Sequence, residues 1–304
     1  MVGTLCCATE TTIAWRCASV NVLAGTRQFD TELAAAEARR AERAALPDSM
    51  DLYFQGRARF NKGSTPENRA EARCFFERAL ALDPSNIGAL VGSALADFAS
   101  FADHQSDDRR ARVAAAEASL TKVLSLAPNH AVAQYLLGSV RIHTNRAAEG
   151  IARCERALGL DRNLADAHVR IGLAKLFTGA AEETERRVLE ALRLSPHDTA
   201  AYVWMLSAGA AKLFLGRDEE AAAWLRRSVE ANPNYPLAHF LLACACAHLD
   251  QLSEARAATK SGLSLDPTFT IHRFRAGASS DNPTYLSQRE RLIDGIRKAG
   301  VPEG

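Results

Sequence analysis

The sequence predicts an all-α fold, a right-handed α-solenoid of about six helix pairs with N- and C-terminal capping helices. Three observations predict it: the composition, a recurring octapeptide, and the regular spacing of its copies. Of the 304 residues, 47% are hydrophobic and only 7% are aromatic, and Ala, Leu, Arg and Glu are abundant. Because these residues are strong helix formers, most of the chain is expected to be helical.

The octapeptide has the form ALALDPSN at 79–86, and related copies follow along the chain. Its proline position falls at Pro84, Pro128, Arg162, Pro196, Pro233 and Pro267. The steps between these positions are 44, 34, 34, 37 and 34 residues. Proline ends a helix because it has no N–H to donate and because it restricts the residue before it. A repeat of this length predicts paired helices that bury their apolar faces only by stacking on their neighbours.

This pattern resembles the tetratricopeptide repeat family, whose motif runs W-x2-L-G-x2-Y, then A-x3-F, then P. The L-G pair of the motif is matched by Leu137-Gly138, Ile171-Gly172 and Leu242-Ala243. The likeness is to a degenerate version, since the W position holds Gln134, His168 and His239. The resemblance implies two antiparallel helices in each unit, and a small eighth residue would let the two helices approach closely.

The register divides the chain as follows. Residues 1–25 are expected to be disordered or poorly packed, 26–48 to form an N-terminal helix or linker, and 271–304 to form a C-terminal capping helix. The solenoid is expected over 49–270, with units at about 49–86, 87–130, 131–164, 165–198, 199–235 and 236–269.

The stretch DLYFQG at 51–56 resembles a protease site used to remove expression tags. Counted back from Pro84, however, Gln55-Gly56 takes the L-G place of the first unit. We therefore interpret the stretch as the native first helix of that unit, with Gly56 facing the second helix.

Two steps of the repeat are longer than 34 residues. The ten extra residues before Pro128 are expected in an extended inter-helix loop at 99–112, because this stretch is charged and has no helical period. The three extra residues before Pro233 are expected near 208–216.

Charge and cysteine usage exclude several classes of function. Lys and Arg total 37 against 36 Asp and Glu, so no basic stripe is expected to bind nucleic acid or an anionic membrane. The longest strongly apolar run, 200–211, is shorter than the roughly 20 residues that span a bilayer. Seven cysteines without framework spacing predict a reducing, cytoplasmic setting.

No motif predicts chemistry. The eight histidines show no HExxH or other metal-ligand spacing, and no phosphate-binding glycine loop is present. In LACACAH, Cys244 and His248 share a helix face, but small residues at a tight helix interface explain the segment better than a metal does. We therefore predict no catalytic residue, cofactor or metal, and we expect that the chain is not an enzyme.

The predicted site is the concave inner face. In this architecture the second, fifth, ninth and twelfth positions of each first helix are expected to point inward, with a few polar residues at the rim. The candidates for a peptide groove are Val132, Tyr135, Ser139, Ile142, His143, Asp166, Val169, Arg170, Leu173, Leu176, Leu237, Phe240, Cys244 and His248. Apolar and lightly charged, they favour a helical or apolar segment of another protein, although the same residues could instead pack against one another.

The segments that flank the array carry a second, narrower resemblance. Over roughly 20–304, stretches such as AAEARRAERAALPDSM and YLSQRERLIDGIRKAGVPEG are similar to the C-terminal half of bacterial class III adenylate cyclase-like signalling proteins. In that family a cyclase domain precedes a tetratricopeptide region, and residues 1–25 are too few to hold it. The resemblance implies an alternative function, as the accessory part of a signalling protein whose catalytic domain is absent from this chain.

Overall fold

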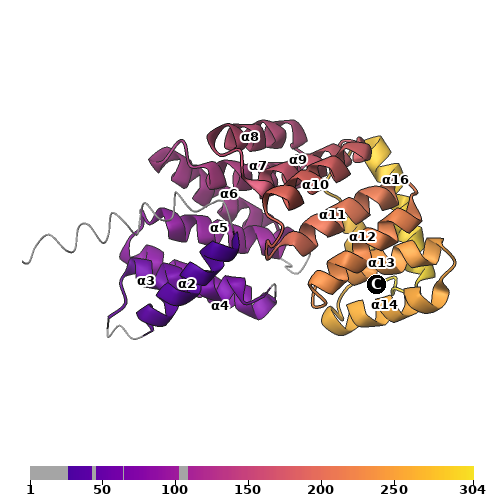
Figure 1. Cartoon of the computed structure of the whole chain (residues 1–304), viewed down its shortest axis with the longest axis horizontal. Coiled ribbons are helices and arrows are strands. Elements are labelled where there is room, and N and C mark those ends of the chain that lie inside the picture. Colours follow the sequence, from indigo (N-terminus) through magenta and orange to yellow (C-terminus); the bar gives the residue numbers. More distant parts are fainter. Residues whose placement is uncertain (1–26, 43–45, 64, 103–108) are drawn as a thin grey trace, which may run out of the picture.

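The computed structural model describes residues 27–42, 46–63, 65–102 and 109–304, and within these ranges it consists of helices and connecting turns, without strands. The predicted all-α repeat fold is confirmed (Figure 1). The segment predicted to be disordered, 1–25, lies outside the described residues.

Antiparallel pairs stack along the molecule, each with a first helix A and a second helix B. The A helices are α3 (Ser49–Asn61), α5 (Ile87–Ala102), α7 (Ala131–His143), α9 (Ala165–Phe177), α11 (Ala201–Phe214) and α13 (Pro236–His248). The B helices are α4 (Pro66–Leu82), α6 (Arg109–Leu126), α8 (Ala147–Leu160), α10 (Thr184–Leu194, after the 3-10 turn η1, Ala181–Glu183), α12 (Asp218–Ala231) and α14 (Leu252–Leu265). Before the pairs comes α2 (Arg27–Ala41), and after them come α15 (Ile271–Ala276) and α16 (Pro283–Lys298).

The turn from helix A to helix B is the same in four consecutive pairs. Two residues after the last residue of the A helix, the chain adopts a left-handed conformation at Asn145, Gly179, Gly216 and Asp250, with φ of 61°, 87°, 71° and 57°. Gly and Asn are the residues that most readily adopt this conformation, and Asp adopts it more readily than most others. The sharp turn lets helix B run back along helix A.

Small residues set the spacing within the pairs, as predicted. A Cβ on Gly138 of α7 would lie 2.8 Å from Cys154 Sγ on α8. The same relation holds in α3, where a Cβ on Gly56 would lie 2.6 Å from Phe76 Cε1 on α4. The stretch DLYFQG is therefore an integral part of α3, in which Leu52, Tyr53 and Phe54 are also buried.

The extended loop predicted at 99–112 is wrong at both of its ends. Helix α5 continues to Ala102 and α6 begins at Arg109, so these two helices have 16 and 18 residues, against 13 and 14 in α7 and α8. Alanines on both sides of the charged stretch keep the chain helical. Residues 103–108 lie outside the described ranges.

The three extra residues predicted near 208–216 lie mostly elsewhere. Helix α9 begins three residues after Arg162, whereas α11 begins five residues after Pro196 and is one residue longer than α9. The turn in front of α11 therefore takes most of the insertion.

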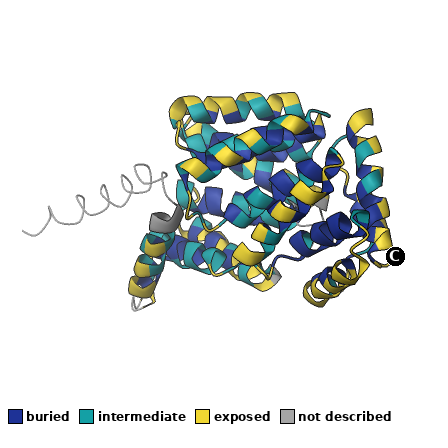
Figure 2. Cartoon of the chain, turned by 45° about the vertical axis from the view of Figure 1, so that its right-hand side comes forward, coloured by how far each residue is buried: buried dark blue, intermediate teal, exposed yellow. Residues whose placement is uncertain are grey.

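The C-terminal region forms two helices, where the sequence predicted one. Helix α15 begins where another A helix would follow, but it ends after six residues. The chain then turns back, and α16 packs against α13 and α11 (Figure 1). Tyr285, Leu292, Ile293 and Ile296 of α16 are buried in this contact. Burial is greatest in the A helices α5, α7, α9, α11 and α13. Figure 2 shows buried residues inside the molecule and exposed residues along its outer helices.

Candidate binding groove

A cavity of about 420 Å³ lies on the inner face, and its walls come from α3, α4, α5, α7, α9, α11, α13 and the C-terminal region. Equivalent positions of successive A helices line it. Positions are counted here from Ala131, Ala165, Tyr202 and Pro236. The second position contributes Val132, Asp166, Val203 and Leu237. The sixth position contributes Leu136, Arg170, Ser207 and Leu241. These two rows run from α7 to α13, and they lie side by side because residues four apart lie on the same face of a helix.

The predicted inward positions are therefore only partly correct. The fifth, ninth and twelfth positions contribute only some of their members, whereas the sixth, which was not predicted as a row, contributes all four. The thirteenth contributes His143, Phe177 and Phe214. One residue turns the side chain by about 100° on a helix, so an error of one position moves a residue from the cavity to the interface between helices.

Eight of the predicted candidates line the cavity: Val132, Tyr135, His143, Asp166, Arg170, Leu173, Leu176 and Leu237. Their part in binding stays a prediction. Six other candidates do not line it.

Four of those six pack within or between the helix pairs. Ile142 faces α8, where a Cβ on Gly150 would lie 2.4 Å from its Cγ1. Val169 belongs to a buried cluster with Trp204. Phe240 stacks on Phe269 with 3.8 Å between ring centroids. The hydroxyl of Ser139 donates to the carbonyl of Tyr135 at 2.9 Å.

The other two, Cys244 and His248, are covered by α16. Cys244 Sγ donates to the carbonyl of Leu292, and His248 Nε2 lies 3.0 Å from the carbonyl of Arg291. Burial raises the pKa of Cys244 far above its usual range and raises that of Cys246 to about 11, so both thiols stay protonated near neutral pH. In the described part of the chain no group of three or more His, Cys, Asp or Glu side chains could hold a metal ion.

A row of rings forms one side of the cavity. The Phe98 and His143 rings lie 5.2 Å apart between centroids, and His143 and Phe177 lie 5.3 Å apart. Tyr285 of α16 continues the row, 5.4 Å from Phe177 and 5.3 Å from Phe214. Sequence reasoning missed this row, although a signal for it exists: rings recur at 143, 177, 214 and 248, in step with the repeat.

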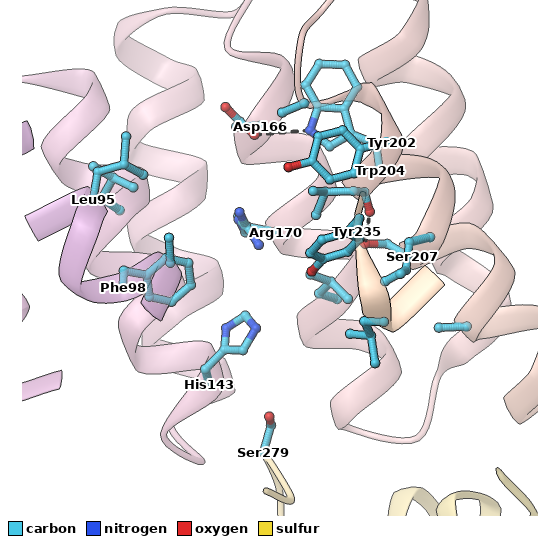
Figure 3. Close-up of a pocket in the computed structure, with 18 of the residues that line it drawn as sticks. Leu95, Phe98, His143, Asp166, Arg170, Tyr202, Trp204, Ser207, Tyr235 and Ser279 are labelled. Atoms are coloured by element: carbon cyan, nitrogen blue, oxygen red, sulfur yellow. Dashed lines mark hydrogen bonds between the residues drawn. The ribbon is translucent and has the colours of Figure 1, made fainter. Parts of the chain in front are cut away.

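Polar groups lie at the centre of the cavity, on α9 (Figure 3). The buried carboxylate of Asp166 accepts a hydrogen bond from Trp204 Nε1 at 3.1 Å and one from the Tyr135 hydroxyl at 3.5 Å. The Arg170 guanidinium lies 5.4 Å from the centroid of the Phe98 ring. The cavity thus combines aromatic and aliphatic walls with a few oriented polar groups, which is typical of ligand sites.

The C-terminal region closes one side of the cavity. Phe274, Gly277, Ser279, Tyr285, Arg289 and Leu292 line it. None of these residues was predicted, because the region does not follow the repeat and its position on the inner face depends on contacts between residues far apart in the sequence.

The comparisons with known proteins agree with this architecture. Residues 202–235 match the tetratricopeptide repeat model, within the fifth predicted unit. A tetratricopeptide repeat protein from Parabacteroides merdae has a similar structure, with a TM-score of 0.54 and 14% identity over 93% of this chain and 96% of that one. A comparison with curated proteins gives no match.

Two larger proteins contain a similar solenoid. A chain of the APC/C hetero-tetramer Cut9-Hcn1 has a TM-score of 0.63 and 13% identity over 88% of this chain, which spans about half (47%) of that chain. A monomeric mutant of IFIT1 with Gppp-AAAA has a TM-score of 0.65 and 16% identity over 86% of this chain and 63% of that one. Identities this low show the fold alone.

The fold is therefore that of a tetratricopeptide-type solenoid. The predicted resemblance to cyclase-like signalling proteins is not shown by these similarities and stays a prediction. Within the described residues, no helix has both the length and the apolar character that crossing a membrane requires.

Proposed function

We propose that the protein is a protein-binding module that holds a helical or apolar segment of another protein in the cavity on its inner face. The observation that carries the proposal is the cavity itself. Two rows of residues from α7, α9, α11 and α13 line it, and it contains both rings and oriented polar groups. Amphipathic helices bind such grooves through their apolar side chains.

The proposal is tested with a display library of helical peptides, from which binders are selected on the purified chain. Leu173 of α9 lines the cavity and is half-buried, so Leu173→Glu places a charge where the apolar face of a bound helix would lie. We expect selected peptides to bind this variant at least about tenfold more weakly, which corresponds to about 1.4 kcal/mol.

Leu189→Glu is the matched control, because Leu189 lies on α10 of the same pair and 51% of its surface is exposed, away from the cavity. Its affinity for the peptides should stay within about twofold of the unmodified chain. Equal losses in both variants, or a library that yields no binder, would refute the proposal. A short single-stranded RNA is tested in parallel, and binding of RNA in preference to every peptide would refute it as well.

A further inference from the structure

Helix α16 is held on the inner face by polar contacts as well as by its apolar side chains. The Arg291 guanidinium donates from both terminal nitrogens to the carboxylate of Asp218, at 3.0 and 2.5 Å, and also to the carbonyl of Leu213 at 3.2 Å. The Asp218 side chain is 10% exposed. A bidentate pair with this little exposure fixes the direction of α16 relative to α11 and α12.

The approach of α16 to α13 is close. A Cβ on Gly295 would lie 2.4 Å from Cys244 Sγ and 2.6 Å from His248 Nε2, so only glycine fits there without a shift. Beyond α16, the amide of Ile271 donates to the carbonyl of Pro302, and that of His272 donates to the carbonyl of Glu303. Because α16 is tied at several places and buries its apolar side, it is a permanent part of the inner face.

The segment in front of α16 crosses to the middle of the solenoid. The amide of Asp281 donates to Asn145 Oδ1 at 3.3 Å, across 136 positions of sequence. A Cβ on Gly179 would lie 3.0 Å from Thr284 Cβ. The C-terminal region therefore reaches the turns after α7 and α9, and it closes the side of the cavity on which the ring row ends.

Tyr285 shows which group this part of the inner face accepts. Its ring lies between Phe177 and Phe214, and it is carried there by a helix laid across A helices. The row continues past Phe177 to His143 and Phe98, and the cavity lies beside these rings. The protein thus contains its own example of an aromatic side chain delivered by a helix to the inner face.

We propose that the C-terminal region is the second wall of the binding groove, and that the partner is an amphipathic helix that lies against this wall and places an aromatic side chain beside the ring row. The inference rests on the proposed function. Edge-to-face and offset contacts between rings favour an aromatic group over an aliphatic one of equal size. The cavity volume falls within the range of roughly 300–1,000 Å³ that is usual for ligand pockets.

The test uses the tightest peptide from the helical library and a variant on the C-terminal wall. Ser279 lines the cavity and belongs to no A helix, so Ser279→Trp fills space from this wall alone. We expect peptide affinity to fall at least about tenfold, and we expect the selected peptides to be enriched in Phe, Tyr or Trp. Leu286→Trp is the control, because Leu286 is on α16, is 40% exposed and does not line the cavity.

The outcomes separate the two proposals. Some peptides could bind Ser279→Trp as tightly as the unmodified chain and still lose affinity in Leu173→Glu. This result would overturn the proposal that the C-terminal region is the second wall, and it would leave the proposed function standing. If the selected peptides are not enriched in Phe, Tyr or Trp, the proposal that the partner supplies an aromatic side chain is overturned.

If Ser279→Trp fails to fold, a small diazirine amino acid at 279 replaces it. Peptide crosslinking above that of the same group at 286 is then expected, and equal or lower crosslinking would overturn the inference.

Discussion

Helices α9 and α13 are equivalent members of the repeat, yet their inner faces have different environments. Leu173 of α9 is half-buried and lines the cavity, whereas Cys244, at the same position of α13, is completely buried under α16. The thirteenth position repeats the contrast: Phe177 faces the cavity, and His248 contacts the backbone of α16. A repeat position therefore determines which way a side chain points, and a non-repeating segment determines whether it stays accessible.

The difference also bears on stability. In a solenoid each pair contacts mainly its neighbours, so stability is close to a sum of local terms. This description suits the pairs from α3 to α8. At the C-terminal end, α16 contacts both α11 and α13, and the segment before it reaches Asn145. These contacts link pairs that are not adjacent, so the C-terminal half is expected to unfold more cooperatively than the N-terminal half.

The largest expected effect comes from loosening α16. Gly295→Ala places a methyl group against Cys244 and His248, and we expect the free energy of unfolding to fall by about 1–3 kcal/mol. Gly159→Ala on α8 is the matched control, because nothing lies within 4 Å of the added methyl group and alanine favours a helix. Denaturant unfolding measures both variants, and hydrogen exchange shows whether α16 opens. If the free energy of unfolding of Gly295→Ala equals that of the unmodified chain, α16 contacts α13 more loosely than the structure shows.

The glycine contrast shows what could be predicted from sequence. The repeat predicted the role of Gly138 and the place of Gly56, because both follow from counting along the unit. It could not predict Gly295, whose neighbours lie about 50 residues away in a contact made once in the chain. Charge and lack of period also gave a wrong prediction at the two ends of 99–112, where helix-forming alanines extend α5 and α6.

The groove itself was predicted only in outline. The repeat gave the inner face, the second-position row and most of the α9 candidates, because these depend on local helix geometry. The expected inward position was wrong by one residue at Ile142 and Phe240. The sequence therefore placed both in the cavity, although they pack against helices of their own pairs. Cys244 and His248 were predicted to be accessible on the inner face, but α16 covers them, and nothing in the repeat indicates this.

A second, smaller effect should depend on pH. Burial lowers the pKa of His248, and the charges of Arg291 and Lys298 act in the same direction, whereas the hydrogen bond to the Arg291 carbonyl and the charge of Asp218 oppose them. Because the unfolded chain then binds the proton more readily, the stability that neutral His248 gives is present above its ordinary pKa and is lost as the pH falls below it. We expect the chain to lose more stability than His248→Gln does between about pH 7.5 and about pH 5.5, on either side of the ordinary histidine pKa.

His272→Gln serves as the control for this titration, since His272 is exposed on α15. Its unfolding free energy should follow that of the unmodified chain at both pH values. If His248→Gln also follows it, the burial of His248 contributes nothing to the pH dependence of stability.

The smallest expected effect is on an ion pair away from α16. Arg226 of α12 and Glu254 of α14 lie 3.0 Å apart, with 42% and 44% of their side chains exposed. Exposed pairs contribute about 0.2–1 kcal/mol and are screened by salt, so a double-mutant cycle with Arg226→Ala and Glu254→Ala should give a coupling energy in this range that falls in about 1 M salt. The same cycle on Arg291 and Asp218 should give a larger coupling that salt reduces less, because Asp218 is largely buried. Equal couplings would mean that the Arg291–Asp218 pair stabilises α16 no more than an exposed ion pair would.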